Sequence, residues 1–346
     1  MNAIRFPLVL ILATATASAP PASGAPANGP ETQVWIDVAT HNQAGMPDMG
    51  AMMSGMGGLA AKVMGGGQGA IGYPDARHPV FTGRFFDVAM RNTLAPGKEA
   101  QQQVPAGLGL GASLPLLPPA PGNRGGEAGG NPGMPDGEIH IKYYWGCGNE
   151  VRAGQPRELH MRAKGGRFET SGDPMQGRYA PDRGIDPDPS YVLWPNRETR
   201  NRAPANASLV GQHRITGPGV PQSLEFELQQ SADFMPKIAL TQRGDLASGV
   251  TLDWQPVDRA KAYFLHGLSL QDKTIVIWSS AEVPDAGQGM VDYLTGAQID
   301  RWLKEKVLLP PSTISCAIPK GIFDTGGGQG GPRNPGMVAH GPGTHL

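Results

Sequence analysis

A strict alternation of apolar and polar side chains begins at Val250, in the C-terminal half of the 346-residue chain. Val250, Leu252 and Trp254 fall on one face of an extended backbone, and the residues between them are polar. A period of two residues is typical of a β-strand with one buried and one solvent-exposed face. Pro256 ends this strand, and two more apolar runs follow before Ser280. The stretch therefore restricts this half of the chain to a β-sheet fold.

The spacing of large side chains in this stretch resembles that of a known family. Trp254, Ala260 and Tyr263, followed by a strand that ends in Trp278, are similar in spacing to strands B, C and later of a fibronectin type III module. The resemblance covers residues 223–323 and implies a fibronectin type III-like, immunoglobulin-like β-sandwich. It implies little about chemistry, because β-sandwiches carry many unrelated functions.

Shorter alternating runs elsewhere predict an all-β chain with two β-sandwich-like units, long Gly/Pro-rich insertions and one short helix in the C-terminal unit. The 50 Gly and 34 Pro residues are clustered, which leaves room for ordered β units between the clusters. Residues 1–27 are predicted to be a signal peptide, and residues 28–163 an N-terminal β domain with two disordered insertions, one rich in Gly and Met at 42–72 and one rich in Gly and Pro at 96–137. A turn-rich connector is predicted at 164–222. The fibronectin type III-like sandwich follows at 223–323, and a disordered tail at 324–346.

The short helix is predicted from its capping pattern. Thr295 and Gln298 match a capping box, in which the Thr hydroxyl accepts a hydrogen bond from the Gln298 amide and the Gln side chain reaches back. An apolar stripe at helical spacing runs from Ile299 to Val307, and Pro310 ends the helix. A helix at this point departs from the plain fibronectin type III pattern.

The first 27 residues have the composition of a secretory signal peptide. Arg5 precedes an apolar run that is too short to span a bilayer, and small residues follow the run. We therefore expect an exported bacterial protein that is periplasmic or extracellular after cleavage. No later stretch is long and apolar enough to predict a transmembrane segment.

The charge of the mature chain excludes two classes of partner. Removal of residues 1–27 takes away one cation, so 28 Lys and Arg side chains face 30 Asp and Glu side chains. A nearly neutral surface gives no long-range attraction toward nucleic acid or an anionic membrane. An envelope protein or an extended envelope polymer is the expected partner.

Cys147 and Cys316 are the only thiols of the chain. An even pair in an exported protein indicates a disulfide. The alternative is two separate buried thiols, each of which packs as a small hydrophobic side chain. The two residues fall in different predicted domains, so pairing requires those domains to share a core or a tight interface. Both alternatives stay open at this point.

A methionine cluster in the first insertion suggests a soft metal. Its members are Met46, Met49, Met52, Met53 and Met56. Thioethers are soft ligands that suit Cu(I), so copper is the candidate cofactor. The alternative is a flexible linker, because Met beside Gly defines little ligand geometry.

Aromatic side chains could form a platform for a carbohydrate ligand. The best candidates are Tyr191 and Trp194, with Arg197 beside them. The alternative is that these aromatic residues belong to a sandwich core.

The common catalytic motifs are not found in the sequence: it has no Gly-x-Ser-x-Gly, no His-Glu-x-x-His, no phosphate loop and no Cys-x-x-Cys. The long Gly/Pro-rich segments carry few groups that could hold and transfer a proton. We therefore predict a non-catalytic binding or structural protein of the bacterial cell envelope, with no catalytic residues. The alternatives are an enzyme that acts on an envelope polymer and a copper-binding protein that uses the methionine cluster.

Overall fold

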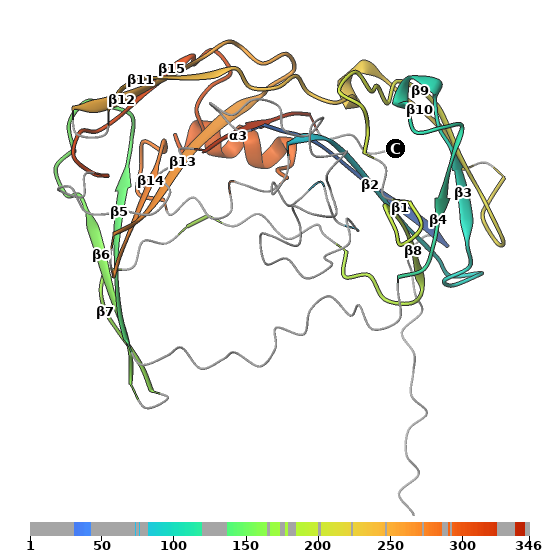
Figure 1. Cartoon of the computed structure of the whole chain (residues 1–346), viewed down its shortest axis with the longest axis horizontal. Coiled ribbons are helices and arrows are strands. Elements are labelled where there is room, and N and C mark those ends of the chain that lie inside the picture. Colours follow the sequence, from blue (N-terminus) through green and yellow to red (C-terminus); the bar gives the residue numbers. More distant parts are fainter. Residues whose placement is uncertain are drawn as a thin grey trace, which may run out of the picture. The chain divides into compact units, whose positions relative to one another are not determined.

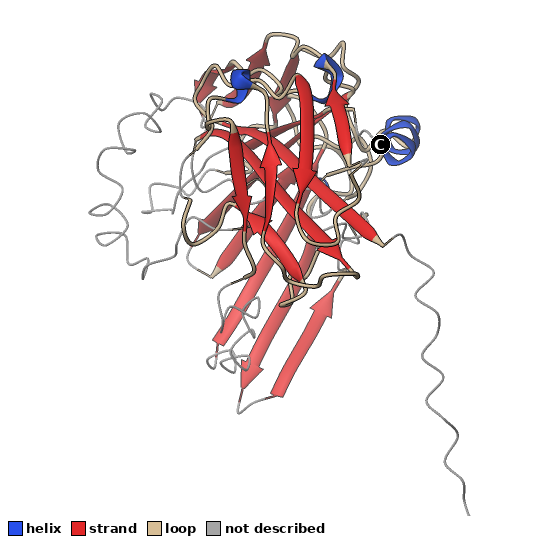
Figure 2. Cartoon of the chain, turned by 90° about the vertical axis from the view of Figure 1, so that its right-hand side faces the viewer, coloured by secondary structure: helices blue, strands red, loops and turns tan. Residues whose placement is uncertain are grey.

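A computed structural model describes the parts of the chain that build two β-sandwiches, all within one compact unit, Thr32–Leu346. Strands dominate these parts (Figure 2). The described residues are 31–42, 73, 76, 82–119, 137–164, 167–173, 177–178, 185–199, 202–222, 224–245, 248–271, 273–285, 290, 293–323 and 336–342. The predicted fold class, an all-β chain with two sandwich-like units and one short helix, is confirmed.

The first sandwich packs the three-stranded sheet β1-β2-β8 against the four-stranded sheet β10-β9-β3-β4 (Figure 1). Phe86, Val88 and Met90 alternate along β2 and share one core with Leu116 of β4 and Ile215 of β9. The elements are β1 (Thr32–His41), β2 (Gly83–Asn92), β3 (Ala100–Gln103), η1 (Ala106–Leu108), β4 (Ser113–Leu116), β8 (Tyr191–Trp194), β9 (Gly211–Thr216), β10 (Glu225–Leu228) and η2 (Gln230–Ala232).

The second sandwich packs the three-stranded sheet β11-β12-β15 against the six-stranded sheet β16-β13-β14-β5-β6-β7. Val250, Leu252 and Trp254 of β12 are buried in its core, so the predicted inner face of this strand is confirmed. The strands are β5 (Gly137–Trp145), β6 (Arg157–Lys164), β7 (Arg167–Gly172), β11 (Leu240–Asp245), β12 (Gly249–Trp254), β13 (Ala262–Gln271), β14 (Thr274–Ser279), β15 (Ser315–Ile318) and β16 (Gly336–His340).

Helix α3 (Gly296–Lys304) has the predicted cap. Thr295 Oγ1 accepts a hydrogen bond from the Gln298 amide (3.1 Å), and Gln298 Oε1 accepts one from the Thr295 amide (2.8 Å). Ile299 and Trp302 on its apolar side share a second small core with Phe264 of β13. The neighbours of Phe264 along β13, Tyr263 and Leu265, belong to the sandwich core instead, so α3 covers the outer face of the six-stranded sheet.

Strands β5 and β14 lie side by side in parallel, with Ile141 opposite Ile275 and Tyr143 opposite Ile277. The other ladders between described strands are antiparallel. This pairing joins segments that sequence analysis assigns to different domains. β5 and all but the last residue of β6 fall within the predicted N-terminal domain at 28–163, but both strands belong to the six-stranded sheet of the second sandwich. Alternation gives the buried face of a strand and not its partner, which explains the different boundary.

Two segments predicted to be disordered contain strands. The Gly/Pro-rich insertion at 96–137 contains β3 and β4, which pair with each other, and Pro115 lies in the edge strand β4, where a missing backbone N–H is tolerated. The tail predicted at 324–346 contains β16, which pairs antiparallel with β13. A five-residue strand with one apolar run gives too weak a local pattern to be predicted, because its hydrogen bonds come from a distant strand.

None of the helices that the structure describes is long and apolar enough to cross a membrane. The predicted signal peptide, 1–27, lies outside the described residues.

Candidate functional site

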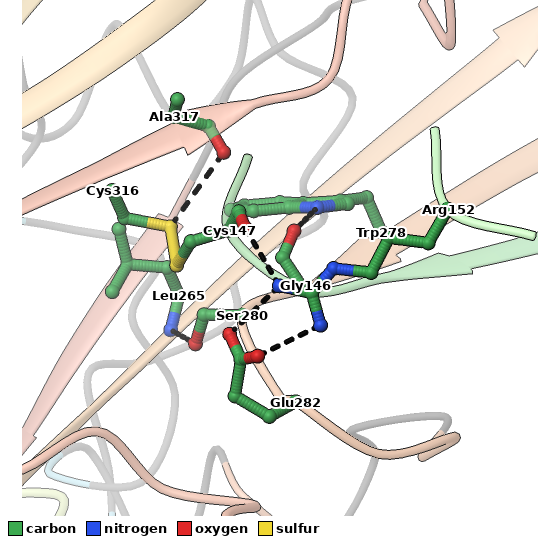
Figure 3. The surroundings of a disulfide bond; sticks show 9 residues. All are labelled: Gly146, Cys147, Arg152, Leu265, Trp278, Ser280, Glu282, Cys316 and Ala317. Carbon is green, nitrogen blue, oxygen red and sulfur yellow. Dashed lines mark hydrogen bonds and ion pairs between the residues drawn. A yellow bond between two sulfur atoms is a disulfide. The ribbon is translucent and has the colours of Figure 1, made fainter. Parts of the chain in front are cut away.

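A disulfide joins Cys147 and Cys316, whose Cα atoms lie 5.1 Å apart (Figure 3). Cys147 follows β5 of the six-stranded sheet, and Cys316 lies on β15 of the three-stranded sheet. The bond therefore links the two sheets of the second sandwich. The two predicted domains share a core at this point, which is the condition that pairing required.

Gly146 and Arg152 shape the chain around Cys147 (Figure 3). Arg152 donates hydrogen bonds to the Cys147 carbonyl oxygen (2.7 Å) and to the Glu282 carboxylate (2.7 and 3.1 Å). Gly146 has a φ of 93°, and a Cβ at this position would lie 2.6 Å from the guanidinium carbon of Arg152. The Gly146 carbonyl oxygen accepts a hydrogen bond from the Trp278 indole N–H (3.1 Å). These contacts fix the turn that brings Cys147 to β15.

The residues of the predicted carbohydrate platform do not form one surface. Trp194 is only 3% exposed and packs in the core of the first sandwich, where its ring centroid lies 5.7 Å from that of Phe86. Tyr191 is half-buried and lies 5.8 Å from Trp35, ring centroid to ring centroid. Arg197 is exposed, with its Nε 3.9 Å from a carboxylate oxygen of Glu198. The position of Trp194 agrees with the alternative, in which the aromatic side chain belongs to a sandwich core.

The candidate copper ligands Met46, Met49, Met52, Met53 and Met56 lie outside the described residues. Copper binding by this segment stays a prediction from the sequence.

A different cluster of ligand-type side chains lies on the hairpin of β5 and β6. His140 of β5 is directly opposite His160 of β6, and Lys142 is opposite Glu158. Side chains two residues apart on a strand share a face, so these four side chains point to the same side of the sheet. The hairpin thus brings two imidazoles and one carboxylate together; we call His140, Glu158 and His160 the His–Glu–His cluster.

The ligand atoms of the His–Glu–His cluster all lie within 4.8 Å of one another. Glu158 Oε2 is 3.2 Å from His140 Nε2 and 4.0 Å from His160 Nε2. The two imidazole rings are stacked, with their centroids 4.0 Å apart and their planes inclined by 16°. The exposed fraction of the side chain increases from 25% for His140 to 40% for Glu158 and 55% for His160. The cluster is therefore accessible to solvent and to ions.

A lysine approaches the other oxygen of the same carboxylate. Lys142 Nζ lies 3.8 Å from Glu158 Oε1, while both imidazoles approach Oε2. Farther along the same hairpin, Arg162 and Glu138 form a separate ion pair, with Nε and Oε1 3.3 Å apart. The face thus carries Lys142, Glu138 and Arg162 beside the His–Glu–His cluster.

Sequence analysis did not identify this cluster. Alternation along 138–147 puts His140 and Lys142 on the polar face of one strand, but His160 is 20 positions away in the chain. The cluster follows from the hairpin register, in which His140 is opposite His160 and Glu158 lies on the same face. Loop length and turn type fix such a register, and the loop between β5 and β6 is too long for the sequence to specify it.

The buried acidic group of the second sandwich is engaged in a structural contact. Asp285 is fully buried, and its Oδ2 accepts hydrogen bonds from the backbone amide (3.1 Å) and a guanidinium nitrogen (2.8 Å) of Arg178. The same guanidinium donates to Glu305 just after α3 (2.6 Å). Hydrogen bonds from Arg301 and Arg178 lower the pKa of the Glu305 carboxyl. This network attaches the segment at Arg178 to the helix end.

Burial lowers the pKa of histidines in both sandwiches. Burial lowers the pKa of His340 on β16 to about 4, against the opposing effect of a hydrogen bond with the Met290 backbone. Burial also lowers the pKa of His266 on β13. Burial likewise lowers the pKa of His41 on β1 and of His213 on β9, so protonation of histidines in acid should weaken both sandwiches.

Comparisons of the chain with protein-family models, with curated proteins and with solved structures found no match.

Proposed function

We propose that the chain is an exported, non-catalytic binding or structural protein of the bacterial cell envelope, located in the periplasm or outside the cell. The observation that carries the proposal is the disulfide between Cys147 and Cys316. Disulfides persist in oxidising compartments and are rare in the cytosol. The signal-peptide composition of residues 1–27 gives independent support for the same location.

The arrangement of strands supports a module of the fibronectin type III or immunoglobulin kind in the second sandwich. β12 lies between β11 and β15 in one sheet, and the next strand, β13, lies beside β16 in the other. Strands B and C alternate between the two sheets of immunoglobulin-like sandwiches in this way. Binding modules built on sandwiches carry their specificity in the loops, because the strands are engaged in pairing and core packing.

A non-catalytic role agrees with the way that buried titratable groups are used. Asp285 binds Arg178, and the buried His340 contacts the Met290 backbone. General acid–base catalysis needs such groups within hydrogen-bond reach of a substrate. Here they hold segments of the fold together. The expected partner is another envelope protein or an envelope polymer.

The proposal is tested by fractionation of the native host. Cells are treated with a membrane-permeant thiol-blocking reagent before lysis, and the chain is then located and its N-terminus sequenced. We expect a periplasmic or secreted chain that begins after residue 27 and carries no blocked thiol. A cytoplasmic chain with Met1 intact and two blocked thiols would refute export.

The non-catalytic part of the proposal has its own test. The purified mature chain is incubated with cell-wall and capsular polymers, and release of fragments is measured. We expect binding by co-sedimentation without fragments. Turnover that is abolished by one carboxylate or histidine substitution, in a variant with unchanged thermal unfolding, would make the chain an enzyme.

A further inference from the structure

We propose that the His–Glu–His cluster on β5 and β6 is a binding site for a divalent transition-metal ion, with Zn²⁺ and Cu²⁺ as the ions that suit its ligands. The site does not depend on the proposed function. It also differs from the methionine cluster in its ligands and in the metal that it would select.

The backbone supplies the arrangement of the ligands. Glu158 and His160 are two positions apart on β6, and His140 is opposite His160 on β5, so the hairpin ladder fixes all three Cα positions. A ligand set of two residues on one strand and a third on its neighbour needs no flexible loop. The ligand atoms lie within 4.8 Å of one another. The fold of the hairpin itself therefore brings the three ligands together.

A small side-chain rotation completes it. Zinc–ligand bonds are about 2.0–2.2 Å long, so ligand atoms in a tetrahedral site are about 3.3–3.6 Å apart. The 3.2 Å between His140 Nε2 and Glu158 Oε2 is already close to this spacing, whereas the 4.0 Å between His160 Nε2 and Glu158 Oε2 is longer. His160 is the most exposed of the three side chains, and it can turn out of its stack with His140 toward a common ion.

The two oxygens of Glu158 have separate neighbours. Lys142 lies at Oε1, and both imidazoles lie at Oε2. An ion bound at Oε2 would leave the contact between Lys142 and Oε1 intact, so the positive charge of Lys142 would stay beside the site and lower its affinity for a cation. Partners of this kind behind a ligating group tune metal affinity.

The ligand types select among metals. Imidazole suits Zn²⁺, Cu²⁺ and Ni²⁺, whereas Ca²⁺ and Mg²⁺ prefer shells made of oxygen ligands. Two histidines with one glutamate form a known three-residue ligand set for zinc, which leaves a fourth position for water or another ligand. Cu(I) prefers thioethers and would select the methionine cluster instead.

The test uses the untagged mature chain, stripped of metal with a chelator and titrated by calorimetry with Zn²⁺ and, separately, with Cu²⁺. We expect one equivalent to bind. Glu158→Gln and His160→Gln should each weaken that binding by at least about tenfold. Glu138→Gln is the matched control, because it makes the same chemical change on the same face of β5, in the ion pair with Arg162, and it should leave the affinity unchanged.

Two further measurements locate the bound ion. Zn²⁺ should shift the imidazole NMR signals that disappear in His140→Gln and His160→Gln. A variant with serine at the five positions of the methionine cluster should bind Zn²⁺ as the wild type does. The proposal fails if the wild type binds neither ion, if Glu158→Gln binds as tightly as the wild type, or if Glu138→Gln weakens binding equally. Unchanged thermal unfolding of each apo variant shows that a loss of binding is not a loss of fold.

Discussion

Reduction of the Cys147–Cys316 disulfide tests how the second sandwich is held together. The bond closes a loop with a sequence separation of 169 residues. The chain-entropy relation gives about 5 kcal/mol for a loop of this length, and measured losses are commonly about 2–4 kcal/mol. Reduction leaves two thiols in place and creates no cavity, so the loss should come mainly from the freed unfolded chain. We expect a loss of about 2–4 kcal/mol in the free energy of unfolding.

The assay is urea unfolding of the oxidised and the reduced chain, followed by tryptophan fluorescence and far-UV circular dichroism. The reduced chain should have a lower midpoint and a steeper dependence on urea, because its unfolded state exposes more surface. A variant with alanine at both cysteine positions should resemble the reduced chain, and a reducing agent should not affect it further. A loss below about 1 kcal/mol would show that core packing alone holds the two sheets together.

Three further predictions concern the core, the pH dependence and the metal site. Trp254→Ala should cost about 3–5 kcal/mol through lost burial and the cavity that remains, whereas Leu268→Ala, at a position that is 53% exposed, should cost little in the same urea assay. His340 titrates at about 4 in the folded chain and near 6.5 when unfolded, so the unfolded chain binds the extra proton as the pH falls between these values. Stability should therefore fall by about 2–3 kcal/mol between pH 7 and pH 4.5, and His340→Gln should reduce this slope; an unchanged slope would show that His340 does not cause it. Lys142→Met should tighten Zn²⁺ binding several-fold, because it removes a positive charge 3.8 Å from Glu158 Oε1. Weaker binding of this variant in calorimetry would contradict the prediction and would show that Lys142 orients the carboxylate.

Local patterns in the sequence were sufficient for individual elements. The inner face of β12 and the capping box at Thr295 depend on neighbours within a few residues, and both were predicted. The side-by-side position of β5 and β14 depends on a contact between distant segments, and alternation contains no record of it. β16 is short and surrounded by glycine in the sequence, so its strand form depends on pairing with β13.

The same distinction explains the candidate sites. Trp194 is a platform candidate in the sequence because Tyr191 and Arg197 lie near it, but its place in the core depends on packing against Phe86. His140 and His160 are ordinary polar-face residues when each strand is considered alone. They become a cluster only through the register of the hairpin.

The parallel pair of β5 and β14 also has a consequence for the order of folding. β5 is synthesised before β8, β9 and β10 of the first sandwich, whereas its partner β14 is synthesised after them. The six-stranded sheet cannot close until most of the chain has been synthesised, and contacts between such distant segments slow folding. During this interval the edge of β5 that later pairs with β14 is free to associate with other strands. Cys147 remains a reactive thiol until Cys316 has been synthesised. A chain built in this way would depend on chaperones and thiol oxidases more than two sandwiches that fold one after the other.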